Sequence, residues 1–122
     1  MDSRHEKRIQ IVQNLYALSF QKTKKIVLPH KQLSKITGEI IKNQKKIDDY
    51  IHRHAPKYPL DKIAKIDLSI LRLAIFELII EKKEPLKVII NEAVEISKQL
   101  GHERSYAFVN AVLGSIVNEI SA

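Results

Sequence analysis

Phe108 is the residue whose type and position most suggest chemistry. An apolar stripe is expected along a helix over residues 103–120, formed by Val109, Val112, Leu113, Ile116 and Ile120. Phe108 lies roughly 100° from the centre of that stripe, and Arg104 lies one helical turn earlier on the same side. An exposed aromatic ring beside a guanidinium can stack on a nucleobase. The spacing leaves a second interpretation open, in which a neighbouring helix covers Phe108.

The positive charge of the chain is concentrated in its first half. The 122 residues carry a net charge of +7. Residues 1–57 hold 13 Lys and Arg against 5 Asp and Glu, whereas the rest of the chain holds 8 against 9. A polarised distribution of this kind suggests that a polyanion binds on one side. The alternative is that the lysines simply cover solvated helix faces.

A central helix is expected over residues 66–80, IDLSILRLAIFELII. Its polar residues Asp67, Ser69, Arg72 and Glu77 scatter around the helix instead of gathering on one face. A helix that is apolar almost all round is buried or spans a membrane. Fifteen residues with three charges are too few and too polar for a span, which needs about 20 apolar residues. We therefore expect a buried core helix, with Asp67 placed to cap its start.

The remaining segments are expected to be amphipathic helices that pack on this core. Their spacing is helical throughout, and they cover residues 4–20, 30–54, 85–100 and 103–120. The second of these has a basic ridge opposite its isoleucine stripe, made of Lys31, Lys35, Lys42, Lys45, Lys46 and Arg53. Two prolines in APKYPLD (residues 55–61) end that helix and divide the chain into two halves.

Residue types and spacing give no support to an enzyme. With no cysteine there is no disulfide, thiol nucleophile or cysteine zinc site. His52 and His54 are two apart and point in different directions on a helix. Glycine-rich phosphate loops and hydrolase motifs are absent from the sequence. We expect no catalytic residues, no metal and no cofactor. The charged N-terminus shows no secretory signal, so we expect a cytoplasmic protein.

Several stretches resemble the NusB family of bacterial transcription antitermination factors. They are PLDKIAKIDLSILRLAIFEL, EPLKVIINEAVEISKQLG and FVNAVL, in this order, together with an N-terminal RHEKRIQIVQNLY. The resemblance covers nearly the whole chain and is weakest over residues 21–31. It implies an all-α fold, a single NusB-like domain with two small antiparallel helical bundles around the central helix. The expected subdomains cover about residues 4–54 and 60–120.

The resemblance also implies a function and partners. Members of the family bind single-stranded boxA-type RNA together with NusE, a ribosomal protein. They support processive transcription of ribosomal RNA operons as part of the antitermination complex of RNA polymerase. Residue by residue, the resemblance implies an RNA-binding set that consists of Arg4, His5, Lys7, Arg8, Gln13, Tyr16, Phe108 and Asn110, to which Arg104 is added from its position next to Phe108.

Two positions depart from the family pattern, and the partner site follows from charge. Ala107 and Ala111 stand where the family usually has lysine before FVN and glycine after it. A basic ribosomal protein should dock on the less basic half, where Glu77, Glu81 and Glu84 are the candidates; the alternative is that they are solvated carboxylates at a helix end. Two further possibilities stay open, a helical protein-interaction module or scaffold without specific RNA binding, and a homodimer that hides the RNA face.

Overall fold

A computed structural model describes residues 3–20 and 27–122. Within these ranges every regular element is helical. The longer helices are α1 (Ser3–Leu18), α2 (Ser34–Lys42), α3 (Gln44–His54), α4 (Lys65–Phe76), α5 (Leu86–Leu100) and α6 (Ser105–Ser121). The short ones are the 3₁₀ turns η1 (Lys31–Leu33) and η2 (Leu60–Lys62) and the π-helical turn η3 (Glu77–Glu81). The all-α fold class is thus confirmed.

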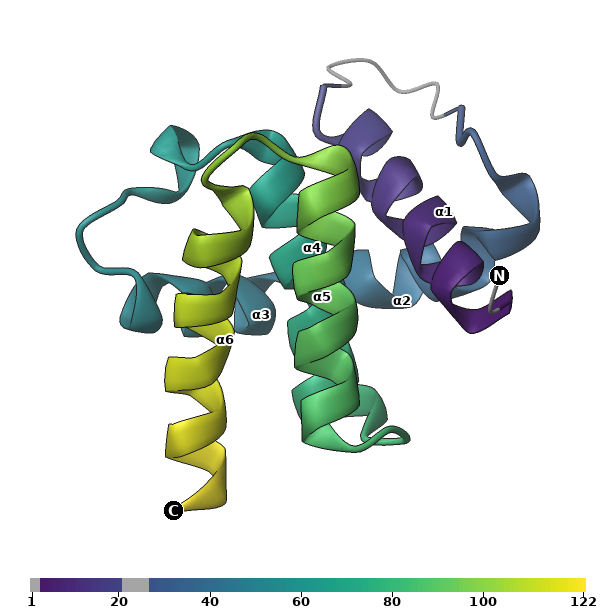
Figure 1. The fold of residues 1–122 in the computed structure, drawn as a ribbon. Coiled ribbons are helices and arrows are strands. Elements are labelled where there is room, and N and C mark those ends of the chain that lie inside the picture. Colours follow the sequence, from purple (N-terminus) through teal and green to yellow (C-terminus); the bar gives the residue numbers. More distant parts are fainter. Residues whose placement is uncertain (1–2, 21–26) are drawn as a thin grey trace.

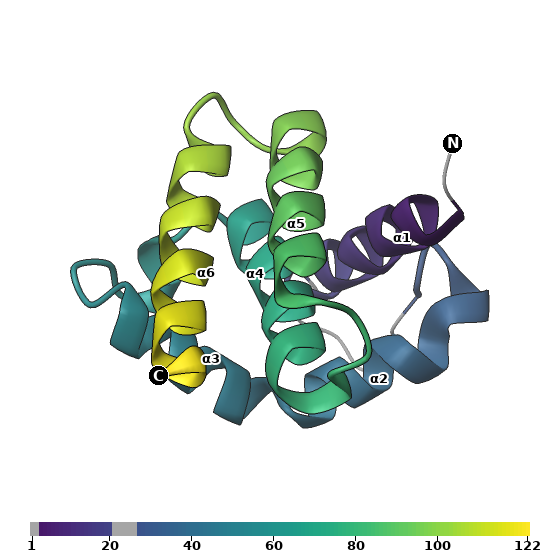
Figure 2. The same cartoon turned by 60° about the horizontal axis from the view of Figure 1, so that its bottom comes forward.

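Helix α4 is the core helix that the sequence predicts. It contacts α1, α2, α3, α5 and α6, and nine of its twelve residues are buried. Helices α5 and α6 lie side by side on one flank of it, and α1 lies on the other side of α5 from α6 (Figure 1, Figure 2). Isoleucines and leucines of the other five helices close around it, among them the fully buried Ile40, Ile47 and Leu113.

The polar residues of the central helix have internal partners. The Ser69 hydroxyl donates to the Lys65 carbonyl at 2.8 Å. Arg72 donates to both carboxylate oxygens of Asp48 on α3, at 2.9 and 3.0 Å. These bonds allow polar groups to scatter around a buried helix, because each buried donor is satisfied. One buried oxygen, Oδ1 of Asp67, has no hydrogen-bond partner among the described residues.

Two predictions about elements are wrong. The single helix expected over residues 30–54 is broken at Asn43, whose backbone leaves the helical region and whose side-chain amide donates to the Glu39 carbonyl at 2.8 Å. Asparagine competes in this way with the helical backbone pattern. Asp67 does not cap α4: Ala64 occupies the N-cap position, and Asp67 lies in the first turn. The division into two helical subdomains stays a prediction.

Candidate nucleic-acid interface

Four basic side chains of α1 belong to the predicted RNA-binding set, and three of them contact carboxylates. Arg4 bonds Glu84 at 3.0 Å. His5 contacts Glu92 through Nδ1 at 3.1 Å and Gln99 through Nε2 at 3.2 Å. Arg8 reaches two carboxylates. We call this group the α1 ion cluster; it consists of Arg4, His5, Arg8, Glu77, Glu84 and Glu92. Lys7 is exposed and has no ion pair to any described residue.

Arg8 lies at the centre of the cluster and is buried. Its Nε and Nη2 donate to Glu77 at distances of 2.8 to 3.2 Å, and its Nη1 donates to Glu92 at 3.0 Å. Only 10% of its side chain is exposed. The guanidinium is therefore occupied by carboxylates from the other end of the chain. Its geometry gives Arg8 an internal role, in place of the exposed phosphate contact that the resemblance implies.

The electrostatics of the Arg8–Glu77 pair reflect its burial. The hydrogen bonds that Arg8 donates to Glu77 raise the pKa of Arg8 above its ordinary value. Burial raises the pKa of the Glu77 carboxyl, and the Arg8 guanidinium opposes that shift. Desolvation penalises a buried charge even when it is paired. Glu77 is held inside the molecule, and the expectation of a solvent-facing carboxylate at this position is not met.

The other two predicted partner-binding residues remain near the surface. Glu81 and Glu84 are half-buried and line a pocket of about 180 Å³ next to α1. Apolar side chains form part of its lining, which includes Ile11, Ile36, Leu73 and Phe76. Glu77 is buried and Glu81 is half-buried, so these two carboxylates do not form the exposed pair that their spacing suggests.

The end of α1 presents two exposed aromatic rings. Tyr16 is 40% exposed and Phe20 is 54% exposed. Their centroids lie 4.8 Å apart with the rings nearly perpendicular. The ammonium group of Lys65 lies 5.6 Å from the centroid of Phe20. Gln13, one turn before, bonds the ring of His30 at 2.6 Å. Tyr16 is thus presented to solvent, as the prediction requires, whereas the amide of Gln13 is already engaged.

Phe108 has a neighbour that the sequence interpretation did not name. It packs partly against the core, and its ring meets that of Tyr58 edge to face at a centroid distance of 5.7 Å. Tyr58 belongs to the loop between α3 and η2. Arg104, immediately before α6, and Asn110 are both exposed. Arg104, Phe108 and Asn110 therefore lie at the start of one helix, and the half-buried ring of Phe108 meets a loop tyrosine as well as the core.

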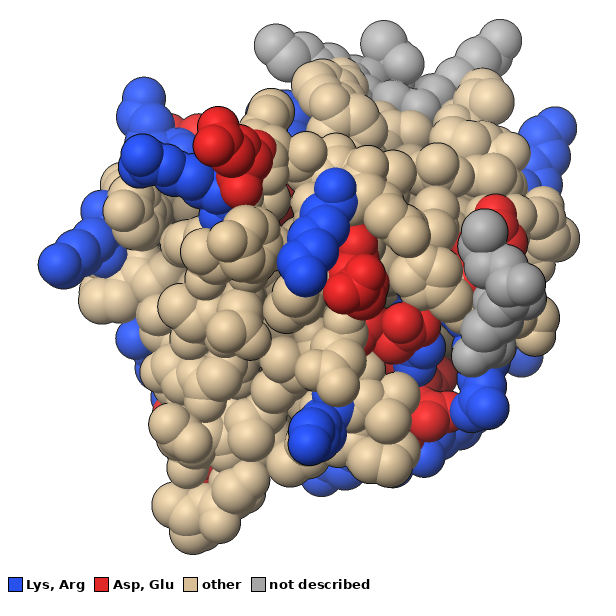
Figure 3. Space-filling model, in the orientation of Figure 1, with Lys and Arg blue, Asp and Glu red and all other residues tan. Residues whose placement is uncertain are grey.

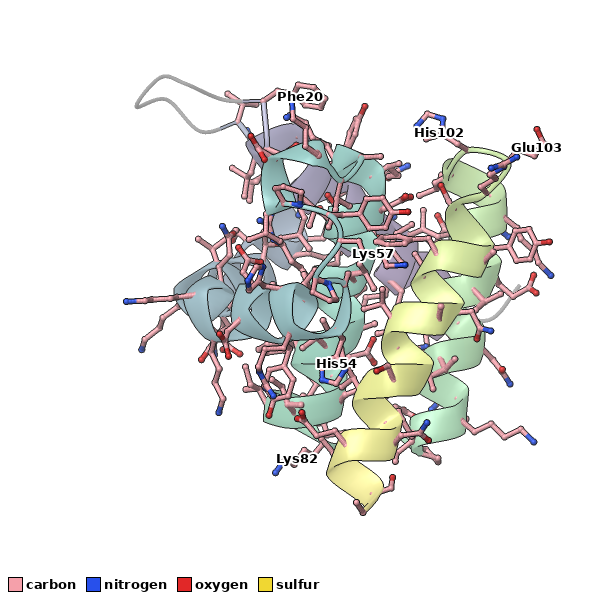
Figure 4. The ribbon with its side chains drawn as sticks, turned by 90° about the vertical axis from the view of Figure 1, so that its left-hand side faces the viewer. Phe20, His54, Lys57, Lys82, His102 and Glu103 are labelled. Atoms are coloured by element: carbon pink, nitrogen blue, oxygen red, sulfur yellow. The ribbon has the colours of Figure 1, made fainter. Side chains whose placement is uncertain are left out.

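Two pairs of aromatic rings, Tyr16–Phe20 and Tyr58–Phe108, lie wholly or partly at the surface of the molecule. Figure 4 shows Phe20 on one side of the view, the α5–α6 turn with His102 and Glu103 on the other, and Lys57 between them. The outer surface of α6 is largely uncharged (Figure 3), because Glu119 is the one charged residue of that helix. We call the surface of the two ring pairs the aromatic face; it is defined by Tyr16, Phe20, Tyr58 and Phe108.

Sequence reasoning missed Phe20, Tyr58 and Lys65 as members of this surface. Phe20 was assigned to the apolar side of the first helix, but α1 ends at Leu18 and leaves it exposed. Tyr58 lies between two prolines, which were interpreted only as a boundary. An aromatic residue in a short loop between two prolines has few core residues to pack against. This pattern could have indicated that the ring of Tyr58 is exposed. His52 and His54 form no metal site, and the described residues contain no cluster suited to a metal ion.

The fold and this surface define a small helical protein with an aromatic face flanked by lysines and arginines. Residues 4–118 match the model of the NusB family, and the chain belongs to that family. A solved structure of T. maritima NusB superposes with a TM-score of 0.81 at 31% sequence identity, covering 97% of this chain and 92% of that one.

Curated relatives give the same result. The chain is 42% identical over 89 residues to the transcription antitermination protein NusB of Caldicellulosiruptor saccharolyticus, covering 72% of this chain and 68% of the relative. It is 41% identical over 81 residues to the protein of that name from Bacillus licheniformis, covering 66% of this chain and 63% of the relative. The matched part is 57% of the relative from Dehalococcoides mccartyi strain 195. In the described part of the chain, no helix is long and apolar enough to cross a membrane.

Proposed function

We propose that this protein is an RNA-binding transcription antitermination factor. It binds single-stranded boxA-type RNA together with the ribosomal protein NusE, in the cytoplasm, and supports processive transcription of ribosomal RNA operons within the antitermination complex of RNA polymerase. The observation that carries the proposal is the aromatic face, where the rings of Tyr16, Phe20 and Tyr58 are exposed, that of Phe108 is half-buried, and Lys65 lies over Phe20. Single-stranded RNA is bound by stacking of its bases on aromatic rings and by cations that follow its backbone.

The proposed RNA contacts divide by chemistry. Tyr16 and Phe108 stack on bases, and Asn110 bonds a base edge. Arg4, His5, Lys7 and Arg104 serve the phosphates, the first two at the cost of competing with Glu84 and Glu92. Gln13 bonds the RNA after its hydrogen bond to the ring of His30 is broken. Arg8 supports this surface from within by tying α1 to α5 and η3.

The partner surface is proposed at the half-buried Glu81 and Glu84. A basic ribosomal protein would meet carboxylates and the apolar lining of the adjacent pocket. Glu77 would act there only through its neighbours, because its carboxylate is held by Arg8.

The test is a binding titration with a short single-stranded boxA-like RNA and a scrambled RNA of the same composition. It is carried out with and without NusE at several salt concentrations. Preference for boxA that is strengthened by NusE and lost in Phe108→Ala supports the proposal. Tyr106→Ala is the matched control, because Tyr106 is 44% exposed on the same helix and stacks with Lys98.

The competing functions predict other outcomes. Equal weak binding of both RNAs, unchanged by Phe108→Ala and by NusE, would overturn the proposal and leave a helical interaction module. In that case binding would also respond little to salt, whereas a single strand gives a log–log slope of about −0.7 for each phosphate neutralised. A homodimer that hides the aromatic face would show RNA affinity that falls as protein concentration rises.

A further inference from the structure

The loop between α3 and α4 holds Tyr58 in a fixed position. Its ends are anchored by Ala55 and Ile63, both 7% exposed. Three turn hydrogen bonds order it: Tyr58 N to the Ala55 carbonyl at 3.1 Å, Lys62 N to Pro59 at 2.8 Å, and Ile63 N to Leu60 at 3.2 Å. Pro56 and Pro59 fix φ on either side of the tyrosine. A side chain on such a loop loses little additional backbone freedom when a ligand binds.

The Tyr58 ring is exposed although it has a packing partner. It is 51% exposed, and it meets Phe108 edge to face with an interplanar angle of 86°. The structure gives its hydroxyl no hydrogen bond to the described residues. A ring presented in this way has a large area free for contact. Because the two rings are nearly perpendicular, one flat base cannot stack face to face on both.

The charges around this ring favour an anionic strand. Lys57 and Lys62 are exposed and have no ion pair to any residue in the described ranges. Lys65 follows at the start of α4, and Asp61 is the one carboxylate between residues 55 and 65. Ala107, next to Phe108, brings no charge. The cations nearest in sequence to the Tyr58–Phe108 pair are therefore those of the loop and Arg104.

We propose that Tyr58 is a second base-stacking residue beside Phe108, and that Lys57 and Lys62 contact the phosphates of the same RNA strand. The two rings take different, successive bases of a single strand, since every base has a face that an aromatic ring can cover. The lysines neutralise the backbone between or next to those bases. This inference rests on the proposed RNA-binding function and extends its site to a loop outside α1 and α6.

A tryptophan at this position gives a direct readout. The chain has no tryptophan, so Tyr58→Trp introduces a single indole whose fluorescence is excited selectively. Titration with the boxA-like RNA should quench this fluorescence at the RNA concentration at which binding is measured independently. The matched control is Tyr106→Trp, whose fluorescence should change little. Unchanged Tyr58→Trp fluorescence on saturation with RNA would overturn the inference.

Affinity measurements complete the test. Tyr58→Ala should weaken RNA binding about 5- to 150-fold, the usual effect of losing one base stack, and Tyr58→Phe should stay within about twofold because the ring is kept. Lys57→Gln with Lys62→Gln should make the log–log salt slope shallower by about 1.4, or two phosphates. Circular dichroism confirms that each variant is folded.

The outcomes separate this inference from the function on which it rests. If Phe108→Ala abolishes boxA preference while Tyr58→Ala binds as the wild type does, the loop is outside the site and only this inference fails. If wild-type protein shows no preference for boxA at all, the proposed function fails and the inference fails with it.

Discussion

The α1 ion cluster and the aromatic face show two uses of the same residue type. Arg8 and Arg104 were both predicted to meet phosphates. Arg8 is buried and bonded to two carboxylates at distances of 2.8 to 3.2 Å, whereas Arg104 is exposed at the start of α6 with no ion pair to the described residues. In the α1 ion cluster, the positive charge of Arg8 is paired with carboxylates of η3 and α5 and stabilises their packing on α1. Beside the aromatic face, the positive charge of Arg104 is exposed to solvent.

The difference shows that a basic sequence is not the same as a basic surface. Arg4 and Arg8 are two of the three Lys and Arg residues of α1, and both meet carboxylates of η3, α5 or the segment between them. Exposed cations without an ion pair to the described residues include Lys7 on α1, Lys57 and Lys62 in the α3–α4 loop and Arg104 before α6, as well as the lysines of the basic ridge on η1, α2 and α3. The electrostatic attraction of a polyanion therefore depends on which cations are already paired with carboxylates of the protein, and a count of charged residues does not show this.

The sharpest test of this comparison is a pair of arginine variants. Arg8→Ala leaves Glu77 buried without its partner and should lower the free energy of unfolding by about 3–5 kcal/mol. Arg104→Ala removes a side chain with no buried partner and should change it by no more than about 0.5 kcal/mol. Urea denaturation measures both. Equal losses would show that the two arginines do not differ in the way described.

A smaller effect is expected from the turn that positions Arg104. A Cβ on Gly101 would lie 2.6 Å from Cβ and Oγ of Ser105 and 2.7 Å from the Ser97 carbonyl oxygen. Gly101→Ala should therefore lower the free energy of unfolding by about 1–3 kcal/mol and weaken RNA binding by displacing the start of α6. Gly114→Ala is the control, since its added Cβ meets nothing within 4 Å. A neutral Gly101→Ala would show that the turn adapts freely.

Salt dependence probes one cation of the aromatic face. Arg104→Gln should make the log–log salt slope of RNA binding shallower by about 0.7, which corresponds to one phosphate. Lys87→Gln on α5 is matched in charge and exposed, lies outside the proposed surface, and should leave the slope unchanged. If both variants reduce the slope alike, RNA binding follows total charge and the comparison of regions breaks down.

The smallest expected effect is a pH dependence within the α1 ion cluster. Burial raises the pKa of Glu77 above 4.5 in the folded protein. As pH rises from 4.5, the unfolded chain releases this proton before the folded chain does, so the free energy of unfolding falls through that window. Glu77→Gln lacks this contribution, so its stability relative to wild type should increase with pH. A decrease would mean that Arg8 outweighs desolvation. Denaturation of both proteins across this pH range provides the measurement.

The helical fold could be predicted because its signals are local. Residues 66–80 are apolar on almost every side of a helix, which predicts a helix buried on all sides. Helix α4 is confirmed as that helix. The prolines in APKYPLD end α3 and open the connection to α4, as expected. The break at Asn43 was not predicted, because the isoleucine stripe continues through it, from Ile40 to Ile47, both of which are fully buried.

The candidate site was only partly accessible to sequence reasoning. Tyr16 and Phe108 could be found from helical spacing and family resemblance. The burial of Arg8 could not, because its partners Glu77 and Glu92 are distant in sequence and nothing local marks the pairing. The contact of Tyr58 with Phe108 is equally non-local. Pairings across the fold depend on how helices pack, which periodicity does not specify.

The α1 ion cluster also affects the order in which the protein is assembled during synthesis. Helix α1 is synthesised before the other described helices, yet the side chains that bond its arginines and His5 lie 69 to 94 residues further along the chain. Until those residues emerge, Arg4, His5 and Arg8 lack the carboxylates that they meet in the folded protein, and α1 cannot complete its packing. Contacts of such long sequence separation form late in folding. The newly made N-terminal helix is therefore expected to remain open to solvent, or to chaperones, until α5 has been translated.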